Sequence, residues 1–126
     1  MDEYVERLKE KIESLLLDDF ELAETAMKTL SEYDKSPAII KWIVERYDEG
    51  IEDLICSEEF EEAGETAKHL LQYDTSYETR KWLSEKMKEI ALLLIDEEDF
   101  ETSKEFMEYS RRILEDHGRD DTQIYK

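Results

Sequence analysis

The chain has 126 residues and a formal net charge of −19, from 36 acidic and 17 basic side chains. A field of this sign repels phosphate groups, so it argues against direct binding to nucleic acid or to an anionic membrane and favours basic protein partners. A single cysteine, an acidic N-terminus and the lack of an apolar run near the ~20 residues of a membrane span predict a cytoplasmic protein. Asparagine is absent, and glutamate and lysine dominate the charge, which is typical of a heat-adapted source.

The first predicted helix covers about residues 2–17, because apolar residues recur there at spacings of three and four. This apolar stripe consists of Val5, Leu8, Ile12, Leu15 and Leu16. Asp18 and Asp19 interrupt it, and either carboxylate can cap a second helix at about residues 20–33. Two amphipathic helices joined by so short a break predict an antiparallel hairpin.

A long helix is expected to begin at Ser36 and Pro37 and to end near Ser57, since serine caps a helix and proline suits its first turn. Gly50 lies inside it at a cost of about 1 kcal/mol relative to alanine, which indicates close packing or a slight bend. Cys56 follows the apolar stripe and is expected in the core. A short helix then begins at Phe60.

The third predicted pair of helices begins at Thr75 and Glu78, which match a capping box. Its long helix extends to about Asp96. The last helix begins at Phe100 and is expected to turn its apolar residues inward and to end at Gly118, leaving a polar tail at residues 119–126.

A repeat of 40 residues organises the chain, because Phe20, Phe60 and Phe100 each follow an acidic residue and precede a glutamate. Lys41-Trp42 matches Lys81-Trp82, while the first helix matches the second long helix with a one-residue slip. A fixed period of this size is the signature of a helical repeat array. We therefore predict an all-α fold of three stacked antiparallel helical hairpins, about six helices in a short right-handed α-solenoid. The expected units are about 2–35, 36–75 and 76–118, within one domain at 1–118.

The segment Glu58-Glu59-Phe60-Glu61-Glu62-Ala63, with Leu70-Leu71-Gln72-Tyr73-Asp74 after it, resembles the second helix of a tetratricopeptide repeat. Similar segments follow Asp19 and Asp99. The resemblance covers the hairpin turns and short helices of all three units but not the long helices, and the period departs from the roughly 34 residues of that family. Armadillo- or HEAT-like stacking therefore stays open. The resemblance implies a scaffold that binds peptides or proteins and is not a catalyst.

No motif predicts an enzyme, a cofactor or a metal site. His69 and His117 are interpreted as surface and helix-end residues, and no Glu-x-x-His pair is present. The acidic run at 96–99 lacks the glycine and ligand spacing of a calcium loop. Trp42 and Trp82 occupy equivalent repeat positions, where a structural role is expected and a binding role stays open.

The third hairpin is more apolar than the repeat pattern requires. Leu92 and Leu93 stand where the second unit has Glu52 and Asp53, and Phe106 and Tyr109 replace smaller or polar residues. A terminal repeat is ordinarily a polar cap, so this excess predicts docking to a second copy, another subunit or the tail. The expected partner-binding residues are Leu92, Leu93, Phe106, Tyr109, Ile113, Trp42 and Trp82.

Two functions follow from these observations. The leading hypothesis is a non-enzymatic interaction module that self-associates or docks a partner through the third hairpin, with acidic faces left for a basic partner. The alternative is an acidic mimic of nucleic acid that inhibits a basic DNA- or RNA-binding protein, a hypothesis that rests on charge alone.

Overall fold

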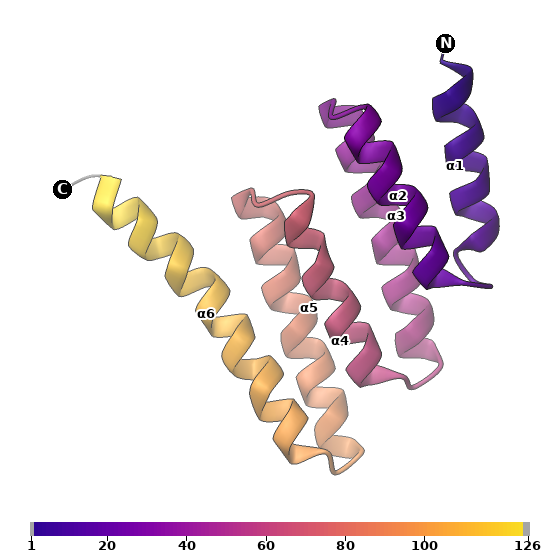
Figure 1. Cartoon of the computed structure of the whole chain (residues 1–126). Coiled ribbons are helices and arrows are strands. Elements are labelled where there is room, and N and C mark those ends of the chain that lie inside the picture. Colours follow the sequence, from indigo (N-terminus) through magenta and orange to yellow (C-terminus); the bar gives the residue numbers. More distant parts are fainter. Residues whose placement is uncertain (1, 125–126) are drawn as a thin grey trace. The chain divides into compact units, whose positions relative to one another are not determined.

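The computed structural model describes the backbone of residues 2–124 and the side chains of residues 2–115. This part of the chain contains six α-helices, one 3₁₀ turn and no strand, which confirms the all-α prediction (Figure 1). The elements in chain order are α1 (Glu3–Leu15), α2 (Phe20–Tyr33), α3 (Pro37–Cys56), α4 (Phe60–Lys68), η1 (His69–Gln72), α5 (Tyr77–Asp96) and α6 (Phe100–Ile124). The expected stop at Gly118 is wrong, because the α6 backbone continues to Ile124.

The chain divides into two compact units, Met1–Asp53 and Leu54–Lys126. Unit 1 contains α1, α2 and most of α3, whereas unit 2 contains α4, α5 and α6. Each unit is described by itself below. The continuous solenoid stays a prediction.

The long helices α3 and α5 begin with the same arrangement of hydrogen bonds. The backbone N–H of Ser36 donates to Oδ1 of Asp34, and that of Ser76 donates to Oδ1 of Asp74, both at 2.9 Å. Each serine hydroxyl then accepts the N–H three residues ahead at 3.4 Å. The predicted cap at Ser36 is confirmed, but the predicted Thr75 cap is wrong, because Ser76 caps α5.

Asp74 accepts one further hydrogen bond at the start of α5. The hydroxyl of Thr79 donates to Oδ2 of Asp74 at 2.7 Å. Burial raises the pKa of Asp74, but the hydrogen bonds from Thr79 and Ser76 outweigh it and hold the pKa below its usual value.

The turns that leave α3 and α5 also share one geometry. Glu58 and Glu98 adopt positive φ values of 61° and 62°, and the next residue in each turn donates its N–H five residues back, to Leu54 and Leu94. This is the Schellman ending of a helix, which glycine ordinarily provides. The turn after α1 has no residue of positive φ, and Asp19 donates to Leu15 instead. The one-residue slip in the first unit therefore changes the turn.

The core of unit 1 is organised around the Phe20 ring. This ring meets Tyr47 edge-on, with centroids 5.7 Å apart, and lies so close to Gly50 that an added Cβ would be 2.2 Å from it. The prediction of close packing at Gly50 is confirmed. The Tyr47 hydroxyl donates to Glu24 at 2.5 Å, which satisfies the polar end of a fully buried side chain.

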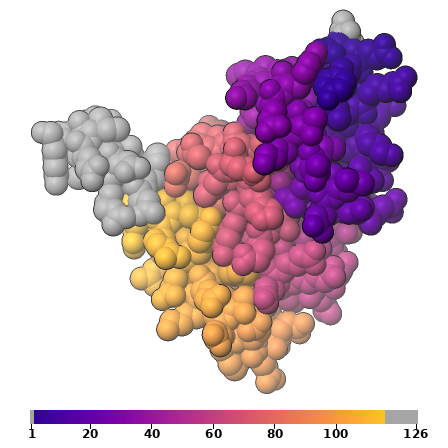
Figure 2. Space-filling model, in the orientation of Figure 1, coloured from indigo at the N-terminus to yellow at the C-terminus, as the bar shows by residue number. Residues whose placement is uncertain are grey.

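The core of unit 2 combines an aromatic contact with a pair of serines. An added Cβ at Gly64 of α4 would lie 2.2 Å from the Phe106 ring of α6, so these helices are in close contact at these two residues. On the outer surface, the pink atoms of α4 and the orange to yellow atoms of α6 lie side by side (Figure 2). Between α5 and α6, the Ser84 and Ser110 hydroxyls lie 2.8 Å apart, and each donates to the backbone carbonyl of the other residue. Small hydroxyl residues therefore bring α5 and α6 close together without an unpaired polar group.

Several residues that were expected in the core are exposed. Cys56 is exposed at the end of α3, and Phe100 is 64% exposed at the start of α6. Leu114, another apolar residue of the last helix that was expected to face inward, is 38% exposed. These positions lie at or beyond the edge of the buried stripe of their helices, where periodicity alone separates inside from outside poorly.

Candidate functional site

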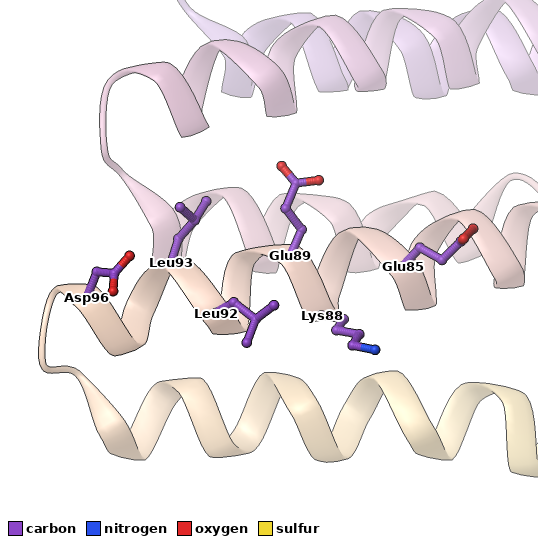
Figure 3. Close-up of a pocket in the computed structure, with 6 residues that line it drawn as sticks. All are labelled: Glu85, Lys88, Glu89, Leu92, Leu93 and Asp96. Carbon is purple, nitrogen blue, oxygen red and sulfur yellow. The ribbon is translucent and has the colours of Figure 1, made fainter.

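A shallow hollow of about 390 Å³ lies along α5 (Figure 3). We call it the α5 groove, and its six lining residues are Glu85, Lys88, Glu89, Leu92, Leu93 and Asp96. All six come from one helix and recur at spacings of three and four, so they form one face of α5. The amphipathic core stripe occupies the opposite face, which turns this one outward.

The centre of the α5 groove is apolar and its ends are charged. Leu92 is 51% exposed and Leu93 is half-buried. Figure 3 shows Leu93 and Glu89 on one side of the helix axis and Leu92 and Lys88 on the other. The groove thus offers two adjacent leucines, three carboxylates and one ammonium group.

One of the three carboxylates already has a cation nearby. Glu89 lies 3.3 Å from the ammonium of Lys86, and this ammonium also lies 5.7 Å from the centroid of Trp82. Glu85 and Asp96 stand at the two ends of the groove. They are therefore the carboxylates best placed to meet a cationic ligand.

The corresponding face of α3 has a different chemistry. Forty residues before the α5 groove stand five carboxylates and one thiol: Glu45, Asp48, Glu49, Glu52, Asp53 and Cys56. The two leucines of the groove thus replace two carboxylates of α3. The helix, its cap and its tryptophan are repeated, while the outer face is not.

A second hollow of about 330 Å³ lies at the turns of unit 2. Phe60 and Leu94 line it together with six carboxylates, from Glu58, Glu59, Glu61, Glu62, Glu97 and Asp99. Both apolar residues are buried, so little of their surface is available to a ligand. The hollow is therefore mainly a concentration of negative charge.

The predicted partner-binding residues do not form one exposed surface. Phe106 and Ile113 are buried, with 1% and 4% of their surfaces exposed. The Phe106 ring packs against Gly64. These two side chains therefore hold unit 2 together. Leu92 is the one residue of the predicted set that is more than half exposed, and Leu93, Tyr109, Trp42 and Trp82 are partly exposed.

Tyr109 is half-buried beneath Lys68, whose ammonium lies 4.8 Å from the centroid of its ring. Burial raises the pKa of Tyr109, although Arg112 and Arg80 act in the opposite direction. The cation–π contact adds to the contact between α4 and α6. Tyr109 is thus engaged inside unit 2.

Trp42 and Trp82 have the same environment in their separate units. Each is partly exposed, and each has a cation from the residue four positions ahead over its ring, Arg46 at 4.9 Å and Lys86 at 5.7 Å. Lys9 adds a second cation over Trp42 at 5.3 Å. These contacts support a structural role for both tryptophans.

The sequence reasoning missed the exposed Phe100 and Leu114 of α6. It assigned Phe100 to the core because Phe20 and Phe60 match it in the repeat. The useful signal was the spacing of seven residues that joins Phe100, Met107 and Leu114, since it marks a stripe beside the buried one.

In the described part of the chain, no three histidine, cysteine, aspartate or glutamate side chains are grouped so as to hold a metal ion. None of the helices described is long and apolar enough to cross a membrane. Comparisons with protein-family models, with curated proteins and with solved structures find no match.

Proposed function

We propose that the chain is a non-enzymatic protein-interaction module of tetratricopeptide-like repeats that docks a partner through its third hairpin. The observation that carries this proposal is the exposed Leu92 beside the partly exposed Leu93 in the α5 groove. An apolar centre with a charged rim is the usual composition of an interaction site on a soluble protein. The equivalent Glu52 and Asp53 of α3 would not provide this centre.

The charges around the groove favour a basic partner. Glu85 and Asp96 flank the leucines at both ends, and Lys88 is the groove's single cation. A segment with an apolar side chain between two cations would cover Leu92 and meet a carboxylate at each end. The net charge of −19 would also raise the rate at which such a segment arrives.

The repeated local geometry supports the repeat-scaffold part of the proposal. The caps at Ser36 and Ser76 and the left-handed turn residues Glu58 and Glu98 recur at intervals of 40 residues. Recurring ends of this kind give hairpins of the same shape, as a solenoid requires. Armadillo- or HEAT-like stacking would use the same hairpins.

The acidic faces favour a second candidate, a mimic of nucleic acid. Five carboxylates follow one face of α3, and six surround the hollow at the turns of unit 2. Such surfaces would compete with phosphates for a basic DNA- or RNA-binding protein. In this case the leucines of the α5 groove would contribute nothing to binding.

One substitution separates the two candidate functions. It weakens the apolar contribution to binding of a basic partner and strengthens the electrostatic contribution. Leu92→Glu removes the centre of the groove and adds a negative charge. A labelled synthetic peptide with leucine flanked by lysines serves as the probe, and its fluorescence anisotropy gives the dissociation constant. Since burying a leucine is worth about 1.5–3 kcal/mol, we expect Leu92→Glu to weaken binding about tenfold or more.

The matched control is Leu22→Glu, which makes the same chemical change at a leucine of unit 1 that is 49% exposed. We expect this control to leave the affinity for the probe unchanged. If both variants instead bind the probe more tightly and to the same extent, and duplex DNA competes with the chain for the probe, the result would support the nucleic-acid mimic. No binding of the probe, or binding insensitive to Leu92→Glu, would reject docking at the α5 groove.

A further inference from the structure

A second apolar surface of unit 2 lies on α6. Phe100, Met107 and Leu114 stand seven residues apart and form one line along the helix, which we call the α6 stripe. Phe100 and Leu114 are 64% and 38% exposed, and Met107 is half-buried. The buried face of α6 is separate and consists of Ser103, Phe106, Ser110 and Ile113.

The counterparts of Phe100 and Met107 in the earlier short helices are less exposed than these two residues. In unit 1, Phe20 packs against Gly50 of α3, and Met27 is fully buried. In unit 2, Phe60 is 8% exposed and Ala67 is fully buried. At the position of Leu114 the earlier units have Asp34 and Asp74, so α6 alone carries an apolar residue at all three positions and leaves Phe100 and Leu114 exposed.

The charges beside the α6 stripe distinguish this surface from the rest of the chain. Residues 100–115 contain four acidic and three basic side chains, a net charge of −1, whereas the whole chain carries −19. Glu101, Lys104, Glu108 and Arg111 alternate in sign along the helix, at spacings of three and four. A second copy of this acidic chain would meet little repulsion here.

The alternation also selects a direction. All four charged residues lie on one flank of the stripe, so in two parallel α6 helices related by a two-fold axis they would lie on opposite sides of the seam and could not pair with one another. In the antiparallel direction, a two-fold axis close to Met107 places Glu101 opposite Arg111 and Lys104 opposite Glu108. Each opposite-charge pair then occurs twice, and Phe100 of one copy lies near Leu114 of the other.

We propose that the α6 stripe binds the α6 stripe of a second copy of this chain, antiparallel about a two-fold axis. The stripe supplies the apolar seam, and the alternating charges set the direction and register. The contact is isologous, so it closes as a dimer. It uses a different helix from the α5 groove and does not depend on the proposed function.

The first experiment measures the mass of the full chain by multi-angle light scattering and sedimentation equilibrium, at about 0.1 M and about 0.5 M salt, which change the screening length. We expect a dimer at both salt concentrations, because the seam is apolar. Phe100→Glu with Leu114→Glu should give a monomer with an unchanged far-ultraviolet circular dichroism spectrum. A wild-type monomer, or a dimer that survives this double variant, would overturn the proposal.

Charge reversal tests the direction. Arg111→Glu places a carboxylate opposite Glu101 and should weaken the dimer about tenfold, and adding Glu101→Arg should restore it. The control, Arg111→Glu with Glu108→Arg, has the same net charge as the wild type but creates like-charge pairs, so it should remain weak. If both double variants regain the dimer affinity of the wild type, or if neither does, the antiparallel register is wrong.

Binding of the leucine–lysine probe peptide is measured on the same variants. A wild-type protein that is monomeric and still binds the probe overturns the dimer and leaves the α5 groove intact, whereas binding of the probe by the monomeric double variant is expected. A wild-type protein that is dimeric but does not bind the probe supports the dimer and rejects docking at the α5 groove.

Discussion

Each unit contains one phenylalanine ring packed against a glycine, but the two contacts are not repeats of one another. In unit 1, Phe20 of the short helix α2 meets Gly50 of the long helix α3. In unit 2, Phe106 of α6 meets Gly64 of the short helix α4. The 40-residue repeat therefore specifies the helices and their caps, while each unit packs its core through residues of its own.

The two rings also differ in their freedom to move. Phe20 is partly exposed, whereas Phe106 is 1% exposed and has the Lys68 ammonium 5.3 Å from its ring centroid. A ring at the edge of a core has solvent on one side and can shift into it. A ring enclosed on all sides transmits any added volume to its neighbours.

The largest expected effect comes from removing the enclosed ring. We expect Phe106→Ala to lower the free energy of unfolding by about 3–5 kcal/mol, because it leaves a cavity between α4 and α6. Phe100→Ala, on the exposed start of the same helix, should change it by no more than about 0.5 kcal/mol. Urea unfolding followed by circular dichroism, at a concentration that fixes the oligomeric state, gives both values. Similar losses for the two variants would mean that Phe106 is not a core residue.

Much of the fold followed from the sequence. The spacing of apolar residues predicted the helices, and the serine and proline before α3 predicted its start, because these signals are local. The burial of Phe106 could not be predicted in this way. It depends on Gly64, 42 positions earlier, coming opposite the ring, which no local pattern encodes. The sequence predicted that Phe106 would be exposed at a binding surface and that Phe100 would face the core, and both predictions are wrong.

The next effect tests the glycines themselves. Gly64→Ala would place a methyl group 2.2 Å from the enclosed Phe106 ring, so we expect a net loss of about 1–2 kcal/mol after the gain in helix propensity. Gly50→Ala faces the partly exposed Phe20 ring at the same distance, and the propensity gain of about 1 kcal/mol should offset most of its cost. The melting temperatures of the two variants, measured by thermal unfolding, show which substitution is more destabilising, and we expect it to be Gly64→Ala.

A second-site variant separates ring contact from backbone effects. Phe106→Leu shortens the side chain, so it should make Gly64→Ala less costly than in the wild type and should leave Gly50→Ala unaffected. Additive effects of Gly64→Ala and Phe106→Leu would show that the methyl group does not meet the ring.

The serine contact between α5 and α6 shows another limit of sequence reasoning. Ser84 and Ser110 were not singled out by any pattern, because a serine within a helix is ordinarily a surface residue. Their mutual hydrogen bonds arise only when the two helices meet at these positions. The α5 groove was easier to find, since Leu92 and Leu93 interrupt a charged face that the repeat itself defines.

The smallest expected effect concerns the turns, where the first hairpin differs from the others. Glu98 adopts a φ of 62°, a conformation that costs a residue with a Cβ about 1–2 kcal/mol and costs glycine little. Glycine loses part of this advantage through its greater freedom in the unfolded chain, so we expect Glu98→Gly to stabilise unit 2 by about 0.5–1 kcal/mol. Asp18→Gly removes the same charge from the first turn, where no residue has a positive φ, and should give no stabilisation. Both variants reduce the net negative charge equally, and measuring both denaturation midpoints at high salt screens the different local charges, so the remaining difference reports mainly the backbone. Equal midpoints would mean that the first turn shares the left-handed ending of the other two.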